Sequence, residues 1–447
     1  MDAIPTAGSS PHPIIGLRTY YLLLVAEAVS MLGSQISGLA VSIAVFRQTG
    51  HATPLALVAF FAAAPPVLLG GFAGALVDRF DRRTIMLIAN IGFALSSGLL
   101  LISFASGHFQ LWHLYVLALA SSLFAVIEGP AFQASVALLV PDAHRDRANA
   151  IGQMTAPAAG IVAPVVAGLL YALIGVVGSI AVDMATFGVA IVALLLVRIP
   201  MPAETEVGRA MSGSIWRQAF DGFRYLWDRP ALLGLSAYFT LVNFLLAGAL
   251  VLLAPYVLSR TGSGAMLGLV LGVVSVGGLA GAGVMGVWGG TRPRIHTIVP
   301  GILIGGLFLA LGGTARGVLS IGASLTLFAF VNPFVGAAAT SILQAKVAPD
   351  VQGRVFAALG QITGLLMPLA YLAAGPLADG VFEPARRLAL WRNVAWLVGA
   401  GPGAGIGLLF IVCGALTALL SLGVYALPTI RRVEAILPDY QATAKAA

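Results

Sequence analysis

The feature that most constrains this chain is a succession of long apolar segments separated by short charged ones. Each has about the 20 residues that a helix needs to cross the roughly 30 Å hydrocarbon core of a bilayer. Twelve such segments can be counted in the 447 residues, and they predict an all-α integral membrane protein with twelve transmembrane helices. Their approximate bounds are 20–46, 52–77, 84–105, 111–139, 149–174, 177–197, 231–258, 265–289, 295–315, 318–345, 355–378 and 401–427.

The composition is that of a protein whose solvent is lipid. Hydrophobic residues make up 59% of the chain and charged residues only 9%, whereas a soluble domain is about a quarter charged. The net charge of +7 comes from residues scattered over short loops, so it indicates topology and not a nucleic-acid partner. The single cysteine, Cys413, lies in an apolar segment, which excludes an internal disulfide.

The distribution of Lys and Arg orients the helices. With the N-terminus in the cytoplasm, 18 of the 24 cationic residues fall in cytoplasmic segments and 6 in outer ones, as the positive-inside rule requires. Both termini are then cytoplasmic. One long cytoplasmic segment, 200–230, separates a six-helix half at 1–199 from another at 231–447. Within it, Ser214–Asp228 has helical amphipathic spacing and is expected to lie in the membrane interface, the alternative being a plain connector.

An internal repeat relates the two halves. A pattern at the start of the fifth segment recurs 208 positions later at the start of the eleventh: Pro141-Asp142, Gly152-Gln153 and Thr155 correspond to Pro349-Asp350, Gly360-Gln361 and Thr363. The two copies enter the membrane in the same direction, because six helices separate them. The sequence therefore predicts a parallel repeat of two bundles.

A short charged loop joins the second and third apolar segments. It reads Gly-Ala-Leu-Val-Asp-Arg-Phe-Asp-Arg-Arg over Gly74–Arg83. So tight a loop couples two helices, and its arginines hold it on the cytoplasmic side; a basic turn that only sets topology is the alternative. The loop resembles the major facilitator superfamily signature Gly-x-Leu-x-Asp-Arg-x-Gly-Arg-Lys. The residues that carry the resemblance are Gly74, Leu76, Asp78, Arg79, Arg82 and Arg83, while Asp81 replaces a glycine and Arg83 a lysine.

Two further resemblances narrow the family. The segment Gly160-Ile-Val-Ala-Pro164-Val-Val-Ala-Gly168 is similar to the fifth-helix antiporter motif, with alanine at two glycine positions, and implies a tight contact between the halves. The segments 375–379, 382–384 and 401–406 resemble the third drug–proton antiporter group, which includes macrolide-efflux and enterobactin-exporter-like proteins.

This resemblance implies two bundles that rock about a cavity lined by the first, fourth, seventh and tenth helices. It implies proton-coupled export of a hydrophobic or amphipathic small molecule across the bacterial cell membrane. Asp78 would latch one state, against the start of the eleventh helix near Arg354. The partners would be the substrate, protons and lipid. The proton gradient would be the energy source, no cofactor would be needed, and the chain would be a monomer.

Three carboxylates lie well inside apolar segments: Glu27, Glu128 and Asp183. A charge at that depth costs at least a few kcal/mol, so such residues usually face a cavity or carry protons. Glu27 and Glu128 are the main candidates for proton coupling, with packing between helices as the alternative. Asp183 is the third, and a hydrogen bond between helices is its favoured role. Many drug–proton antiporters have an arginine inside the fourth helix, and this sequence departs from them, because no basic residue other than His113 occurs between Leu111 and Val140.

Polar and small residues follow Glu27 along one side of the first helix, which predicts the wall of an aqueous cavity. They include Ser30, Met31, Ser34, Gln35 and Gly38. The C-terminal half has no acid at comparable depth. Its candidates for substrate contact are the polar residues Tyr238, Asn243, Asn332 and Gln344.

The sequence carries no enzyme signature. With Lys346 and Lys445 as the only lysines, no phosphate-binding loop ending in Lys-Ser/Thr exists, and the six histidines lack metal-ligand spacing. A dedicated exporter of a siderophore or other secondary metabolite, an uptake permease and a non-transporting receptor or scaffold stay open as alternatives.

Overall fold

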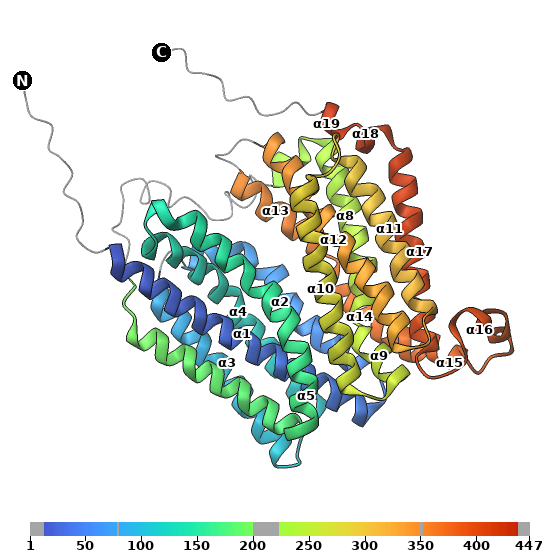
Figure 1. Cartoon of the computed structure of the whole chain (residues 1–447), viewed down its shortest axis with the longest axis horizontal. Helices are drawn as coiled ribbons and strands as arrows, with labels where there is room; N and C mark the ends of the chain where they lie inside the picture. The colour runs from blue at the N-terminus through green and yellow to red at the C-terminus, as the bar shows by residue number, and fades with distance from the viewer. Residues whose placement is uncertain (1–12, 78–79, 200–222, 348–351, 437–447) are drawn as a thin grey trace, which may run out of the picture.

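The N-terminal half consists of long helices joined by short turns (Figure 1). The structure, a computed structural model, describes residues 13–77, 80–199, 223–347 and 352–436. Regular structure within these residues is entirely helical. The helices of this half are α1 (Pro13–Thr49), α2 (Thr53–Val77), α3 (Arg82–Ala105), α4 (Leu111–Leu139) and α5 (Asp142–Leu196).

The C-terminal half repeats this pattern with more interruptions. Its seventh span divides into α8 and α9, and its eleventh into α13, α14, a π-helical turn η1 and the short α15. The bounds are α8 (Pro230–Leu250), α9 (Leu253–Thr261), α10 (Gly264–Trp288), α11 (Ile295–Thr314), α12 (Val318–Lys346), α13 (Gln352–Gly364), α14 (Met367–Leu377), η1 (Ala378–Phe382), α15 (Glu383–Ala385), η2 (Ala389–Trp391), α16 (Arg392–Val398), α17 (Ala404–Ala426), α18 (Pro428–Arg431) and α19 (Val433–Ile436).

The prediction of twelve spans is confirmed. Eleven helices in the described ranges are long and apolar enough to cross a membrane. One of them, α5, has 55 residues, which is too long for a single span. It contains Gly175 at φ 66°, in the left-handed region that glycine adopts without a steric penalty. The fifth and sixth spans meet there.

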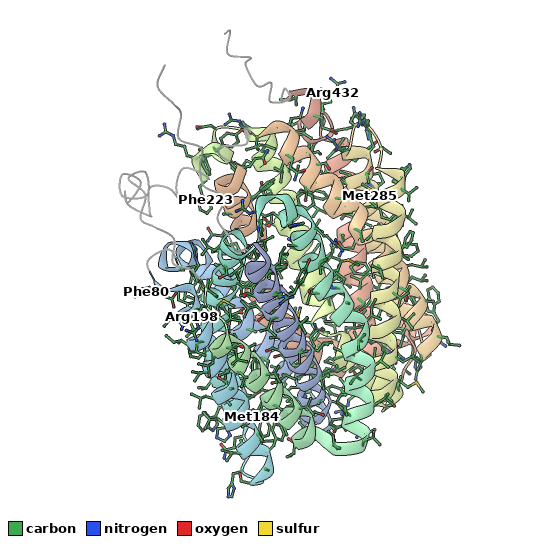
Figure 2. All side chains as sticks on the ribbon, turned by 60° about the vertical axis from the view of Figure 1, so that its left-hand side comes forward. Phe80, Met184, Arg198, Phe223, Met285 and Arg432 are labelled. Atoms are coloured by element: carbon green, nitrogen blue, oxygen red, sulfur yellow. The ribbon has the colours of Figure 1, made fainter. Side chains whose placement is uncertain are left out.

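The two halves converge toward one end of the molecule. In Figure 1 the axes of the two bundles meet near α5 and α9 and diverge toward the ends where α1 begins and α19 lies. Figure 2 shows Phe80 and Arg198 at the diverging end of the N-terminal half, and Phe223 and Arg432 at that of the C-terminal half. The charge distribution makes this diverging end cytoplasmic, so the halves are closed on the outer side. Most of the linker 200–230 lies outside the described residues.

The contact between α5 and α10 depends on small residues. A Cβ on Gly268 of α10 would lie 2.3 Å from the carbonyl oxygen of Pro164, and one on Gly168 of α5 would lie 3.1 Å from that of Gly264. The hydroxyl of Ser275 donates a hydrogen bond of 2.6 Å to the carbonyl oxygen of Gly160. The structure thus places Gly160, Pro164 and Gly168 at a contact between the halves, where small residues let helix backbones approach in lipid.

An ordered loop, Glu383–Gly403, covers the outer end of the C-terminal half. The indole of Trp391 is buried and donates to the carbonyl oxygen of Gly399 at 3.0 Å. Arg260 donates to the carbonyl oxygen of Val398 at 2.8 Å, and Arg316 to that of Trp396 at 2.6 Å. These bonds attach the loop to the helices beneath it.

Substituting Gly268→Ala should destabilise the contact between α5 and α10, because the added Cβ would overlap backbone atoms that cannot rotate away. We expect a cost of about 1–3 kcal/mol, measured as a lower melting temperature in detergent. Gly283→Ala on the same helix is the control, since a Cβ there meets nothing within 4 Å. Equal melting temperatures for the two variants would contradict the contact.

Candidate functional site

A cavity lined by acids and serines lies inside the N-terminal half. It has a volume of about 620 Å³ and is lined by all five helices of that half. None of its described lining residues is Lys, Arg or His, although three are acids. The acids and the polar wall are Glu27, Ser30, Ser34, Ser37, Ser42, Asn90, Ser96, Ser97, Ser121, Ser122, Glu128 and Asp183.

Glu27 of α1 and Glu128 of α4 form a carboxyl pair on the wall of this cavity. Their side chains are close enough to interact by hydrogen bonding and by charge. Glu128 is 9% exposed, and its Oε1 is buried without a hydrogen-bond partner among the described protein atoms. Two carboxylates in such a place repel each other when both are ionised, and one bound proton removes that repulsion. The pair therefore has the chemistry of a proton-binding site.

Asp183 of α5 lies on the same cavity but is held differently. Its Oδ1 accepts a hydrogen bond of 3.0 Å from Ser34 of α1, and its Oδ2 accepts one from Ser97 of α3. The carboxylate thus bridges three helices with its acceptors satisfied, whereas Glu128 retains an unsatisfied oxygen. This is the geometry of a bond between helices, the role favoured for Asp183 by its place in the sequence.

Asn90, Ser96 and Ser97 of α3 and Ser122 of α4 complete the wall and were not selected from the sequence. Asn90, Phe93 and Ser97 follow one another at the spacing of a helix face. Ser122 donates a hydrogen bond of 2.6 Å to the carbonyl oxygen of Ala62, which joins α4 to α2. The serines and asparagine recur at helical spacing in otherwise apolar segments, and this pattern could have identified them as cavity residues from the sequence.

A second, more apolar space lies between the halves. Two adjoining cavities of about 630 and 360 Å³ share Leu250, Phe328 and Asn332. The larger is bounded by Gly160 of α5 on one side and by α10 and α12 on the other. Asn332 precedes Pro333, the proline inside α12, and is the polar side chain common to both cavities. Such a space, mostly apolar with few polar groups, is typical of sites for small organic molecules.

The expected cavity lined jointly by the first, fourth, seventh and tenth helices is not among the cavities described above, whose linings form two separate spaces. Ser30, Met31, Ser34 and Gly38 line the one inside the N-terminal half. Asn243 lines the smaller cavity between the halves, and its amide donates to the carbonyl oxygen of Thr363 at 3.1 Å.

The remaining candidates for substrate contact lie elsewhere. Tyr238 is buried in the core of the C-terminal half, with its hydroxyl 2.7 Å from that of Ser421. Gln35 is half-buried and Gln344 exposed, and neither lines the cavities described above.

The signature loop is described in part. Gly74 lies in α2, while Asp78 and Arg79 lie outside the described residues, as does the side chain of Arg354. Arg83 donates hydrogen bonds of 2.8 Å to the carbonyl oxygens of Leu194 and Leu195, at the last turn of α5. Arg82 is half-buried beside it. Asp81, at the position of the missing glycine, caps α3 by accepting from the Thr84 N–H at 2.9 Å.

The described residues contain no cluster of three potential metal ligands. Two six-helix halves, closed on the outer side around internal cavities, have the architecture of a membrane transporter. The model of the Major Facilitator Superfamily matches residues 23–371. The chain belongs to this superfamily of transporters, and is a multi-pass protein of the bacterial cell membrane and not an enzyme.

Two of the similar proteins are named for efflux, and a third is an uncharacterised transporter. Macrolide efflux protein A of Streptococcus pyogenes is 26% identical over 366 residues, which cover 81% of this chain and 90% of that protein. Multidrug efflux pump Tap of Mycolicibacterium fortuitum is 25% identical, covering 83% and 91%. YfiS of Bacillus subtilis, an uncharacterised transporter of this type, is 29% identical, covering 91% and 92%.

Solved structures share the fold at low sequence identity. A bacterial homologue of the human lysosomal transporter Spinster, in an inward-facing and unoccupied conformation, superimposes with a TM-score of 0.69 at 15% identity, covering 92% of this chain and 98% of that one. The nucleoside transporter NupG superimposes with a TM-score of 0.67 at 10% identity, covering 92% and 99%.

Replacing Asp183 distinguishes a bond between helices from a proton carrier. Asp183→Asn keeps an oxygen that accepts from Ser34 or Ser97, so we expect near-normal transport and a small loss of stability. Asp183→Ala leaves the hydroxyls without their acceptor and should cost about 1–3 kcal/mol, measured by the melting temperature. If Asp183→Asn abolished proton-driven transport while its melting temperature stayed normal, a bond between helices would not explain the role of Asp183.

Proposed function

We propose that this protein exports a hydrophobic or amphipathic small molecule by alternating access, driven by the inward flow of protons. The observation that carries the proposal is the Glu27–Glu128 pair on a cavity whose described lining residues include no cation. The efflux activities named for the relatives support the outward direction and the chemical class of the substrate.

In this mechanism the proton and the substrate occupy different spaces. The carboxyl pair takes up a proton when its cavity faces the acidic outer side and releases it when the cavity faces the cytoplasm. The apolar space between the halves receives the substrate, with Asn332 as its polar contact and Phe328 as its aromatic one. Rocking of the halves about the α5–α10 contact exposes both spaces to either side in turn.

Glu27→Gln and Glu128→Gln test the proton site. Each variant keeps the shape of the side chain but cannot ionise, so we expect efflux driven by a pH gradient in proteoliposomes to fall about tenfold or more. Exchange of labelled for unlabelled substrate, which needs no net proton movement, should persist. Asp228→Asn is the control, because Asp228 is an exposed carboxylate whose side chain is 61% accessible.

Two outcomes would count against this site. Normal gradient-driven efflux in both glutamine variants would remove the pair from the coupling mechanism. Loss of exchange together with efflux would show that the pair is needed for binding or folding, and a melting curve would separate those two cases.

Asn332→Leu tests the substrate space. Losing the amide that both cavities share should weaken binding about five- to tenfold, measured by titration of the purified protein with fluorescent amphipathic compounds. Gln344→Leu, on the same helix but away from the cavities, should bind normally. Equal affinities for the two variants would place the substrate elsewhere.

A panel of ligands separates broad efflux from a dedicated exporter. If macrolides and unrelated amphipathic compounds all raise the melting temperature, the protein is a multidrug exporter. Stabilisation by a single siderophore or metabolite class would favour the dedicated alternative.

A further inference from the structure

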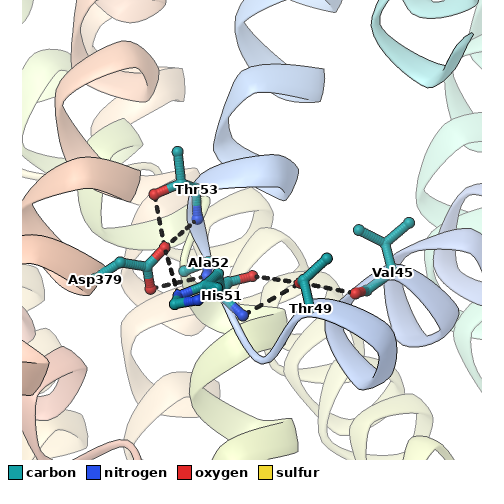
Figure 3. Close-up of polar contacts among 6 residues, drawn as sticks. All are labelled: Val45, Thr49, His51, Ala52, Thr53 and Asp379. Atoms are coloured by element: carbon teal, nitrogen blue, oxygen red, sulfur yellow. Dashed lines mark hydrogen bonds and ion pairs between the residues drawn. The ribbon is translucent and has the colours of Figure 1, made fainter. Parts of the chain in front are cut away.

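Two charged side chains make hydrogen bonds directly between the halves on the closed outer side, among the residues that the structure describes. Arg47 of α1 donates to the carbonyl oxygen of Gly262 at 3.2 Å, and Asp379 makes the larger set of bonds. Asp379 lies in the π-helical turn η1 of the eleventh span, and its carboxylate reaches the start of α2 (Figure 3). Its Oδ1 accepts from the backbone N–H of Ala52 at 2.9 Å. Its Oδ2 accepts from the backbone N–H of Thr53 at 2.7 Å and from the Thr53 hydroxyl at 2.6 Å.

The other charged groups around Asp379 are more distant or turned elsewhere. His51 Nδ1 lies 3.8 Å from the carboxylate, and the imidazole is 66% exposed. Glu383, Arg386 and Arg387 line the same outer cavity of about 390 Å³. Arg386 pairs with Glu383 at 2.7 Å, so its charge is already opposed by a carboxylate. Asp379 itself is 15% exposed, and its bonds to α2 are its main interactions.

The start of α2 lacks a cap of its own. The first turn of a helix has N–H groups without partners inside the helix, and a local Ser, Thr, Asp or Asn side chain usually satisfies them. Here the first turn contains no acid, and Pro54 has no N–H to donate. The cap comes instead from a residue of the other half, 326 positions away from Thr53. An anion at a helix N-terminus is further favoured by the helix dipole.

The backbones must come close for this bond to form. A Cβ on Gly375, one turn before Asp379, would lie 2.6 Å from the Cα of Thr53. Ala52, Ala374 and Ala378 are buried in the same outer apolar cluster. Small residues therefore bring α14 against α2, and Asp379 closes the contact.

Glu383, four residues later, shows what a cap within one half looks like. Its Oε1 accepts from the Ile406 N–H at 3.1 Å, at the start of α17. Both of these groups belong to the C-terminal half and stay together when the halves separate. Asp379 and Glu383 thus cap helices from the same segment, but only the Asp379 bonds must break when the outer side opens.

We infer that Asp379 is the outer latch of the transport cycle. Its bonds to Ala52 and Thr53 hold the outer side closed, and their release sets how often the protein opens outward. Breaking them exposes a carboxylate and two N–H groups to water, which rehydrates all three, so the latch is reversible. The inference rests on the proposed alternating access, and it is independent of substrate and of proton coupling.

The test measures the distance across the outer side directly. Spin labels are placed at Gln48 of α1 and at Asn393 of the outer loop, both exposed, in a Cys413→Ser background of the full chain. The distance distribution is recorded by pulsed electron resonance in lipid nanodiscs. We expect Asp379→Ala to raise the ratio of long to short distances at least about tenfold, and Asp379→Asn to have a smaller effect of the same sign.

Two further variants keep the test decisive if Asp379→Ala folds poorly. Thr53→Val, in the N-terminal half, removes the hydroxyl that donates to Asp379 and preserves the shape of the side chain. It should raise the ratio of long to short distances, as Asp379→Ala does. Glu383→Ala should lower the melting temperature but leave the ratio unchanged.

A wild-type ratio in Asp379→Asn and Thr53→Val, or an equal shift in Glu383→Ala, would overturn the inference. A shifted ratio in a protein that transports no amphipathic compound would refute the proposed substrate class and leave the latch standing.

Discussion

Helices in lipid gain little from burying apolar side chains against each other, because the surrounding chains are equally apolar. Close backbone approach and a few polar bonds must then hold the bundles together. The α5–α10 contact shows how this constraint is met: Gly168 and Gly268 remove the side chains that would separate the helices, and Ser275 adds a hydrogen bond to the carbonyl oxygen of Gly160. The closed outer side, the divergence of the halves toward the cytoplasm and the shape of the apolar space between them all depend on this approach.

The buried acids of the N-terminal half differ in how many hydrogen-bond partners surround them. Asp183 has two hydroxyl donors from neighbouring helices and is fixed in place. Glu128, which interacts with Glu27, keeps one oxygen without a partner among the described atoms. In the proposed mechanism the carboxyl group with incomplete bonding, Glu128, takes part in binding the proton, and Asp183, whose oxygens are bonded to two other helices, has a structural role. Burial alone would not distinguish the two, and their hydrogen-bond partners do.

The sequence was sufficient to predict the fold because the signal was long and periodic. Twelve apolar segments and the charge asymmetry are properties of single helices, so no tertiary information was needed. The candidate site was less accessible. Tyr238 and Asn243 occupy the same apolar segment, yet one is buried against Ser421 and the other lines a cavity. Which side of a helix faces a neighbour in lipid is weakly encoded, because the lipid-facing and packed faces are both apolar. The cap of α2 by Asp379 was equally hidden, since it joins residues that are more than 300 positions apart.

The two kinds of internal space belong to different parts of the chain. The acid-lined one is built wholly from N-terminal helices, while the apolar one takes most of its surface from α8, α10 and α12. In the proposed mechanism this division is modular: mutations that broaden or narrow the range of substrates could accumulate in the C-terminal half without altering the proton-binding site in the N-terminal half. On that proposal, selection by a new toxic compound would act mainly on the C-terminal half. A chimera that exchanges halves between relatives would then take its substrate range from one parent and its proton coupling from the other.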